Sequence, residues 1–215
     1  DWYRPQSYHN SCDWRSSWKG EGGGVIINQC PHNLDLWQWL FGMPSEIRAF
    51  ADFGKYYDIE VEDDVTVYMR YPNGVTGVFI ASTGESPGTS RLEVTGTMGK
   101  LLYENGEIKY IRNRVDEREF NKTFTSSVAA GPESWESMLK ADGTPMQHKK
   151  ITQNFVNAIF YGEDLIAPGL EGINEMMISN AIHMSAWSGE TVKLPIDNEK
   201  FYKMLCNKIE HSRKA

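Results

Sequence analysis

The sequence predicts an α+β fold, with a large and mainly antiparallel sheet that carries helices on one face. Two β-hairpin patterns follow one another in the middle of the chain, and hairpins in series build an antiparallel sheet without βαβ crossovers. Amphipathic helical patterns then appear near residues 151–161, 171–188 and 198–212. Each of these helices needs a surface on which to bury its apolar stripe, and one face of the sheet provides it.

Alternating apolar and polar residues mark the strands. The two hairpins turn at Asn73-Gly74 and at Asn105-Gly106, and Asn-Gly is the strongest short signal for a hairpin turn. The expected strands span residues 47–51, 65–70, 75–82, 92–95, 100–103, 107–111 and 191–196.

The remaining elements are read from turn and cap residues. Residues 112–147 are polar and rich in turn residues, which predicts a strand near residues 118–125 followed by a long loop. The last helix is expected to begin after Asn198, which is a suitable N-cap.

The composition indicates one globular domain over residues 1–215. The chain has 22 basic and 29 acidic residues and a net charge of -7, without a cluster of basic residues, so nucleic acid is excluded as a partner. No apolar run approaches the roughly 18 to 20 residues of a membrane span. The first residues lack the charged and apolar regions of a signal peptide, so we expect a cytoplasmic protein without membrane contact.

Three cysteines, Cys12, Cys30 and Cys206, are too few and too irregular for a disulfide framework and indicate free thiols. A zinc site remains as the alternative, because His9 and Cys12 together with Cys30 and His32 would offer four ligands. Their spacing does not match that of structural zinc sites, and we therefore predict no metal.

The chain is organised around residues 20–44. Three consecutive glycines, Gly22 to Gly24, allow the backbone to approach another segment closely, and a short buried apolar segment follows at residues 25–27. A helical pattern then begins at His32 and ends at Gly42. Asn28 and His32 therefore stand at the junction of a buried segment and a helix, where polar side chains can converge on a ligand.

This stretch resembles the start of the C-terminal domain of Gfo/Idh/MocA-type oxidoreductases. The pattern is Gly-Gly-Gly-Val-Ile-Ile-Asn-Gln-x-x-His-x-x-Asp-x-x-x-Trp-Leu-Phe-Gly, and similar short matches continue to residue 195. The resemblance implies NAD- or NADP-dependent oxidation or reduction of a hydroxyl group on a sugar, glycoside or polyol, and association of copies through the sheet face into a homodimer or a higher homo-oligomer.

Two positions of this sequence match positions that have a function in the family. The resemblance implies that His32 is the catalytic histidine that faces the nicotinamide and the reacting hydroxyl. The position four residues earlier is commonly aspartate in the family and is Asn28 here. An asparagine can bind a sugar hydroxyl but cannot serve as a general base, so we expect Asn28 only to bind substrate.

No phosphate-binding Gly-x-Gly-x-x-Gly turn and no second βα unit occur in the sequence, which excludes a Rossmann fold. The family's dinucleotide-binding domain and its Glu-Lys-Pro motif lie before the region of resemblance. We therefore expect NAD or NADP only in a full-length enzyme, and neither a cofactor nor activity for this chain alone.

Aromatic and arginine side chains are unusually dense in residues 1–20. This density fits a cap over the core, but it also fits a wall that stacks on a sugar ring, with Tyr8, Trp14 and Arg15 as substrate-binding residues. Asp35 lies one helical turn beyond His32 and could orient its ring or bind the backbone.

Three classes of function follow. The first is the substrate-binding and oligomerising domain of a sugar oxidoreductase. The second is a non-catalytic module that senses sugars or mediates interactions, and the third is an enzyme that cleaves glycosides with the help of NAD. The absence of a carboxylate at position 28 favours the last two, and without the family motif a structural histidine at a helix start would explain His32.

Overall fold

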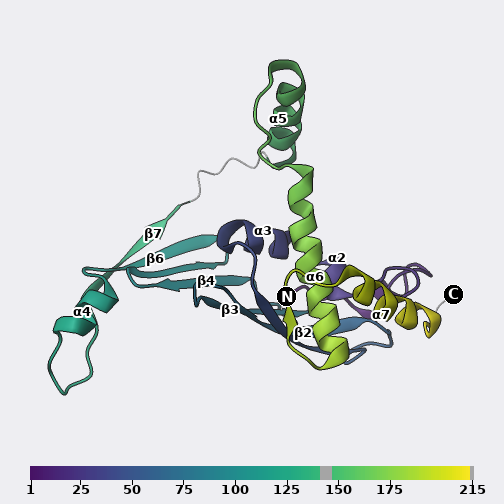
Figure 1. Cartoon of the computed structure of the whole chain (residues 1–215), viewed down its shortest axis with the longest axis horizontal. Helices are drawn as coiled ribbons and strands as arrows, with labels where there is room; N and C mark the ends of the chain where they lie inside the picture. Colours follow the sequence, from purple (N-terminus) through teal and green to yellow (C-terminus); the bar gives the residue numbers. More distant parts are fainter. Residues whose placement is uncertain (141–146, 214–215) are drawn as a thin grey trace. The chain divides into compact units, whose positions relative to one another are not determined.

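The computed structural model describes residues 1–140 and 147–213. The chain forms two compact units: unit 1 comprises Asp1–Gly88 and Leu165–Ala215, and unit 2 comprises Thr89–Asp164. All pairings between strands are antiparallel, and helices accompany them, so the predicted α+β class is confirmed. The strands are distributed over two four-stranded sheets, in the orders β3-β2-β1-β8 and β4-β5-β6-β7 (Figure 1). The division falls between β3 and β4, where Pro87 has no N–H to donate to a ladder.

Unit 1 contains the sheet of β1 (Glu46–Phe53), β2 (Glu62–Arg70), β3 (Thr76–Ser82) and β8 (Val192–Lys193). Its helices are α1 (Gln6–His9), α2 (Val25–Asn28), α3 (Pro31–Phe41), the 3-10 helix η1 (Gly169–Glu171), α6 (Gly172–Ser188) and α7 (Asn198–Glu210). Two of the predicted features are confirmed here: β2 and β3 are joined across Asn73-Gly74, and α3 ends at Gly42, whose φ of 75° favours glycine.

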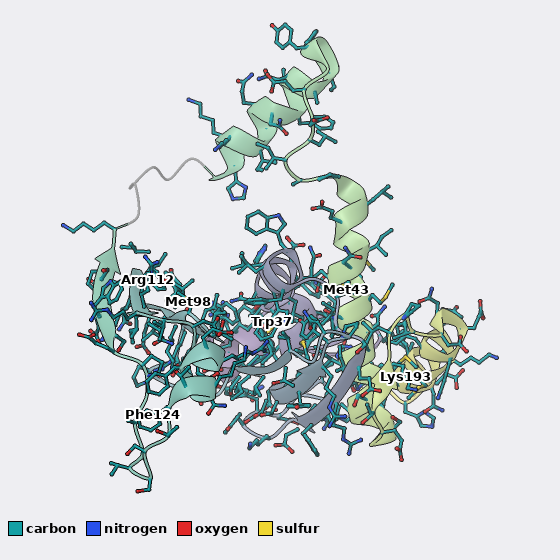
Figure 2. The ribbon with its side chains drawn as sticks, turned by 60° about the vertical axis from the view of Figure 1, so that its left-hand side comes forward. Trp37, Met43, Met98, Arg112, Phe124 and Lys193 are labelled. Carbon is teal, nitrogen blue, oxygen red and sulfur yellow. The ribbon has the colours of Figure 1, made fainter. Side chains whose placement is uncertain are left out.

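The core of unit 1 lies between one face of this sheet and the helices α2, α3 and α6. The inward face follows from the strand register, which aligns Ala49 with Val67 and Phe79 across β1, β2 and β3. Trp37 of α3, labelled in Figure 2, packs over β3, where a Cβ at Gly77 would lie 2.4 Å from its ring. Because α2 and α3 are held against this sheet, the core fixes the position of the junction between them.

Unit 2 contains the sheet of β4 (Arg91–Gly96), β5 (Gly99–Glu104), β6 (Glu107–Asn113) and β7 (Ser134–Leu139), with α4 (Glu117–Thr123) and α5 (Gln147–Tyr161). The register gives this sheet one apolar face, and the residues on it include Leu92, Val94, Leu101, Tyr103, Ile108, Tyr110 and Leu139. Its other face is charged, with ion pairs between Arg91, Glu93 and Lys100. No described residue of unit 2 is buried.

Two predictions for residues 112–147 are wrong. The expected strand at residues 118–125 is the helix α4, because the Asp116 side chain accepts a hydrogen bond from Arg118 N at 2.9 Å and acidic residues occupy the first turn. The expected long loop contains β7, and all six of its residues are exposed, so no apolar alternation marks it in the sequence. The end of that predicted loop, at residues 141–146, lies outside the described residues.

Two further expectations for the helices need correction. The N-cap of α7 is Asp197, which accepts a hydrogen bond from Lys200 N at 3.0 Å, and Asn198 is the first helical residue. The apolar stripe of α5 was expected to be buried on the sheet, but Phe155 and Ile159 are 56% and 66% exposed. An amphipathic pattern predicts the helix and its apolar face, but it does not state what that face contacts.

None of the helices in the described part of the chain is long and apolar enough to cross a membrane.

Candidate functional site

The glycine-rich segment brings α2 against the core. A Cβ on Gly24 would lie 2.1 Å from the backbone oxygen of Glu62, and a Cβ on Gly23 would lie 2.9 Å from the ring of His183. Side chains at these two positions would therefore push α2 away from β2 and α6. The predicted close approach of the backbone is confirmed, and its partners are β2 and α6.

A buried carboxylate holds the start of α2. Glu62, at the start of β2, accepts hydrogen bonds at Oε1 from Gly24 N at 2.8 Å and from Ile26 N at 3.2 Å. His183 Nε2 lies 3.0 Å from Glu62 Oε1, which is within ion-pair distance. The geometry between these two atoms does not meet that of a hydrogen bond. Both side chains are almost fully buried. Burial by itself raises the pKa of the Glu62 carboxyl, but the charge of His183 and the backbone N–H groups outweigh it, so this pKa lies below its ordinary value.

Asn28, the last residue of α2, lies at the centre of a polar network. Its Oδ1 accepts a hydrogen bond from the Tyr8 hydroxyl at 3.2 Å and from Gln29 Nε2 at 2.8 Å. The Tyr8 oxygen in turn accepts from Arg15 Nη1 at 2.6 Å. The structure thus brings together three of the predicted substrate-binding residues, Tyr8, Arg15 and Asn28.

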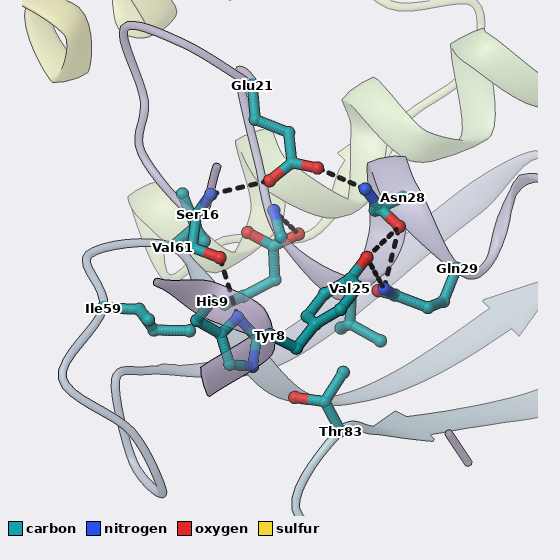
Figure 3. Close-up of a pocket in the computed structure, with 12 residues that line it drawn as sticks. Tyr8, His9, Ser16, Glu21, Val25, Asn28, Gln29, Ile59, Val61 and Thr83 are labelled. Carbon is teal, nitrogen blue, oxygen red and sulfur yellow. Dashed lines mark hydrogen bonds between the residues drawn. The ribbon is translucent and has the colours of Figure 1, made fainter. Parts of the chain in front are cut away.

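Glu21 completes this network from the loop before the glycines. Its Oε2 accepts a hydrogen bond from Ser16 N at 2.7 Å, and its Oε1 accepts one from Asn28 Nδ2. Figure 3 shows the side chains of Glu21, Asn28, Gln29 and Tyr8 converging around one point, joined by these bonds. The network therefore has a carboxylate at one end and the Arg15 guanidinium at the other.

The space enclosed by these side chains is small. The pocket lined by Tyr8, Glu21, Asn28 and Gln29 has a volume of about 10 Å³, roughly that of one water molecule. A sugar does not fit inside it, so a ligand would bind on its outer side, where the Asn28 side chain is exposed.

Aromatic and arginine side chains lie close together beside the network. The Arg15 guanidinium lies 4.3 Å from the centre of the Tyr8 ring and 4.7 Å from that of Trp14. Trp14 is 47% exposed, so part of its ring is in contact with solvent. Arg4 approaches the Tyr8 ring at 5.3 Å and adds a second cation to the same surface.

His32 is the second residue of α3, and its side chain is exposed. Asp35 accepts a hydrogen bond from Gln38 Nε2 at 3.1 Å, and no hydrogen bond joins it to the His32 ring among the described residues. Glu175 of α6 lies near both. Burial raises the pKa of the Glu175 carboxyl and the charge of Asp35 adds to this rise, while the Ser179 hydroxyl and His32 oppose it.

The cysteines and histidines considered for zinc do not form a cluster. Among residues 1–140 and 147–213, no group of three or more His, Cys, Asp or Glu side chains is arranged to hold a metal ion. Cys30 is buried in the core, and this burial raises the pKa of its thiol.

A polar surface of this kind can bind a hydroxylated ligand and can exchange a proton with it. The amide of Asn28 offers hydrogen bonds to hydroxyl groups, Trp14 offers an aromatic ring, and the imidazole of His32 is a side chain that commonly serves as a general acid or base. Sequence reasoning missed Glu21, Gln29, Glu62 and His183. Glu21 lies beside the glycines and could have been noticed, whereas Glu62 and His183 reach the site from distant segments.

Comparison with known proteins gives a family model that matches part of the chain. Residues 1–102 match the model of the GFO/IDH/MocA C-terminal domain. The search of curated proteins gives no match.

Several solved structures share the fold. The WlbA dehydrogenase from Bordetella pertussis, in complex with NADH and UDP-GlcNAcA, is 22% identical with a TM-score of 0.62, and the match covers 91% of this chain and 52% of that one. An NAD binding oxidoreductase from Klebsiella pneumoniae is 21% identical with a TM-score of 0.67, covering 86% and 54%. A levoglucosan dehydrogenase, in complex with NADH and levoglucosan, is 18% identical with a TM-score of 0.66, covering 90% and 57%.

The chain therefore spans about half the length of the solved structures it matches. The family match covers the glycine-rich segment, α2, α3 and the network around Asn28. Residues 1–102 are thus similar to the GFO/IDH/MocA C-terminal domain, in agreement with the motif at residues 20–44, and the solved structures share the fold of the chain.

Proposed function

We propose that this chain is the substrate-binding part of an oxidoreductase that acts on a hydroxyl group of a sugar, a glycoside or a polyol. The observation that carries the proposal is the convergence of Tyr8, Arg15 and Asn28 beside the exposed Trp14, on the segment that leads into α3, whose second residue is His32. An aromatic face and a set of hydrogen-bonding groups are what a sugar ring requires, because its C–H groups stack and its hydroxyls need partners.

The nicotinamide cofactor would be held outside the described residues of this chain. All described strand pairings are antiparallel, and no strand leads through a glycine turn into a helix in the manner of a dinucleotide site. In the full-length enzyme, NAD or NADP would accept the hydride from the carbon of the substrate. His32 would take the proton of the hydroxyl, and Asn28 would position it.

In a full-length enzyme, replacing His32 by Ala is expected to lower kcat by roughly 10²-fold or more, the usual contribution of a general acid or base. Asn28→Ala should act mainly on KM, because the amide positions the substrate and does not titrate. The measurement is a steady-state profile against pH with a sugar found by screening NAD and NADP reduction.

His211→Ala is the matched control, since His211 is also exposed and lies outside the network, where it contacts Asn207 O. Retention of nearly full kcat in His32→Ala would show that this histidine is structural. A full-length protein that binds a sugar without reducing either cofactor would favour the second candidate, a non-catalytic sugar-binding module, which the amide at Asn28 in place of a carboxylate also supports.

We further propose that the outward face of the unit 1 sheet joins two copies of the chain. Phe50, Val78 and Ile80 on this face are 61%, 55% and 58% exposed, and adjacent apolar side chains of this kind favour association. A homodimer would cover them.

Ile80→Lys is therefore expected to weaken the dimer about 100-fold or more, which corresponds to about 2.7 kcal/mol, because each copy would bring an unpaired charge into the interface. Sedimentation at micromolar concentration measures this change. Leu170→Lys is the control, since Leu170 is 79% exposed on η1. A wild-type protein that sediments as a monomer would contradict the proposal.

A further inference from the structure

The structure assigns to Glu21 a role that deepens the proposed function and rests on it: Glu21 is the positioning residue that fixes the orientation of the Asn28 amide toward a sugar hydroxyl. The carboxylate of Glu21 lies against Asn28 Nδ2 and is anchored on its other side by Ser16 N at 2.7 Å. A carboxylate accepts hydrogen bonds and does not donate them, so only the NH₂ group of Asn28 can face it.

The other end of the network enforces the same orientation. Arg15 can only donate, and its Nη1 donates to the Tyr8 oxygen at 2.6 Å, which leaves the Tyr8 proton for Asn28 Oδ1 at 3.2 Å. Gln29 Nε2 also donates to Asn28 Oδ1, at 2.8 Å. The bonds from Arg15 to Tyr8, from Tyr8 to Asn28 and from Asn28 to Glu21 therefore run in one direction, from a cation to an anion, and such chains strengthen their members. Gln29 Nε2 donates into this chain from the side, to Asn28 Oδ1 and to the Tyr8 oxygen at 3.3 Å.

This direction decides what Asn28 presents to a ligand. One Nδ2 proton is bonded to Glu21, and Oδ1 is occupied by Tyr8 and Gln29, so the second Nδ2 proton is what remains on this exposed side chain. It can donate to the oxygen of a sugar hydroxyl. A hydroxyl oxygen that accepts from Asn28 keeps its own proton for another acceptor, and His32 lies four residues along the chain. Glu21 thereby leaves the hydroxyl proton for an acceptor other than Asn28.

The residue type at position 28 is consistent with the positioning role of Glu21. The resemblance implies that a carboxylate is common at position 28 of the family, and here that position is an amide. Glu21 places a negative charge next to this amide. Glu21 acts through Asn28, so it does not itself touch the substrate.

The test uses Glu21→Gln in the full chain, because the carboxamide keeps the size of the side chain but can donate as well as accept. The two Nδ2 protons of Asn28, assigned by their loss in Asn28→Ala, are followed by NMR exchange with water. In the wild type, the proton that faces Glu21 is expected to exchange about 10-fold more slowly than its partner, because bonds to a carboxylate are stronger than neutral ones. Glu21→Gln should remove this difference.

The second measurement titrates glucose, glucuronate and inositol, as a neutral hexose, a uronate and a cyclic polyol. Glu21→Gln is expected to weaken the binding of whichever sugar the wild type binds by about 10-fold, since the amide can then turn over. Glu85→Gln is the matched control, because it makes the same change of charge at an exposed residue of the loop after β3. Melting temperatures of both variants, compared with the wild type, show whether the fold is kept.

The outcomes separate the two proposals. Loss of slow exchange together with weaker sugar binding supports the role of Glu21. If the wild type binds none of the sugars but Glu21→Gln still loses the slow exchange, the orientation of Asn28 by Glu21 is supported and the proposed sugar-binding function is contradicted. The role of Glu21 is overturned if slow exchange persists in Glu21→Gln, or if exchange changes while an existing sugar affinity does not.

Discussion

Replacing Glu62 by Ala is expected to lower the free energy of unfolding by about 3–5 kcal/mol, the usual cost of removing one partner from a buried ion pair. The variant leaves His183 buried without its carboxylate, and it leaves Gly24 N and Ile26 N without their acceptor. Urea unfolding followed by tryptophan fluorescence measures this loss. Glu62→Gln keeps an acceptor for the two N–H groups and should cost less, roughly 1–3 kcal/mol, so it yields a value even where Glu62→Ala does not accumulate as folded protein.

The same carboxylate predicts how stability depends on pH. The pKa of Glu62 is lower in the folded state than in the unfolded state, so its stabilising contribution is present above the unfolded-state value of about 4.3. This contribution is lost as the pH falls through the folded-state pKa, and Glu62→Gln should remove that part of the acid dependence. Glu93→Ala is the control, because Glu93 pairs with Arg91 and Lys100 on the surface and its loss should change the unfolding midpoint little. Equal shifts of the unfolding midpoint in Glu62→Gln and Glu93→Ala would show that burial does not increase the contribution of Glu62 to stability.

Gly24→Ala is expected to be strongly destabilising, with a loss of about 3 kcal/mol or more of unfolding free energy. The new Cβ would lie 2.1 Å from the backbone oxygen of Glu62 and 2.9 Å from Val61 Cγ2. The first of these atoms belongs to β2, which is paired on both sides and cannot move without breaking its ladders. The variant should also shift the NMR signals of Asn28 and His32, since α2 must move away from the sheet.

Gly172→Ala provides the comparison for this experiment. A Cβ on Gly172 meets no atom within 4 Å, and its φ of -59° is helical, so the change should be neutral or stabilising by up to about 1 kcal/mol. Thermal and urea unfolding of the pair measures the difference. A Gly24→Ala protein as stable as Gly172→Ala would mean that the close approach of α2 to β2 is not required for folding.

Local patterns were sufficient to predict most of the fold. The hairpins at Asn73-Gly74 and Asn105-Gly106 form as expected, because both signals are contained in a few adjacent residues. The strand β7 escaped prediction because all its residues are exposed, and its place is set by pairing with the distant strand β6. The helix α4 was mistaken for a strand because its cap, Asp116, was not recognised as a helix start.

The residues of the candidate site also fall into two groups, those that the sequence could predict and those that it could not. Asn28 and His32 could be named from one short motif, and Tyr8, Trp14 and Arg15 from the density of aromatic and basic residues. The Glu62–His183 pair could not be predicted, because its two members come from β2 and α6 and meet only when the sheet is covered by its helices. The orientation of the Asn28 amide depends on four side chains at once, and a linear sequence does not contain that information.

The absence of buried residues in the described part of unit 2 bears on how the protein would lose its structure. Resistance to local opening comes mainly from apolar side chains shielded from water, and the residues of β4 to β7 are at most half-buried. The ladders of this sheet therefore open at a lower free energy than those of β1 and β2, whose inward side chains include the buried Ile47, Val65 and Val67. Any surface that covers the apolar face of unit 2 would raise that free energy in proportion to the logarithm of its own concentration. Order in unit 2 and binding of such a partner then form a single equilibrium, and dilution weakens both together.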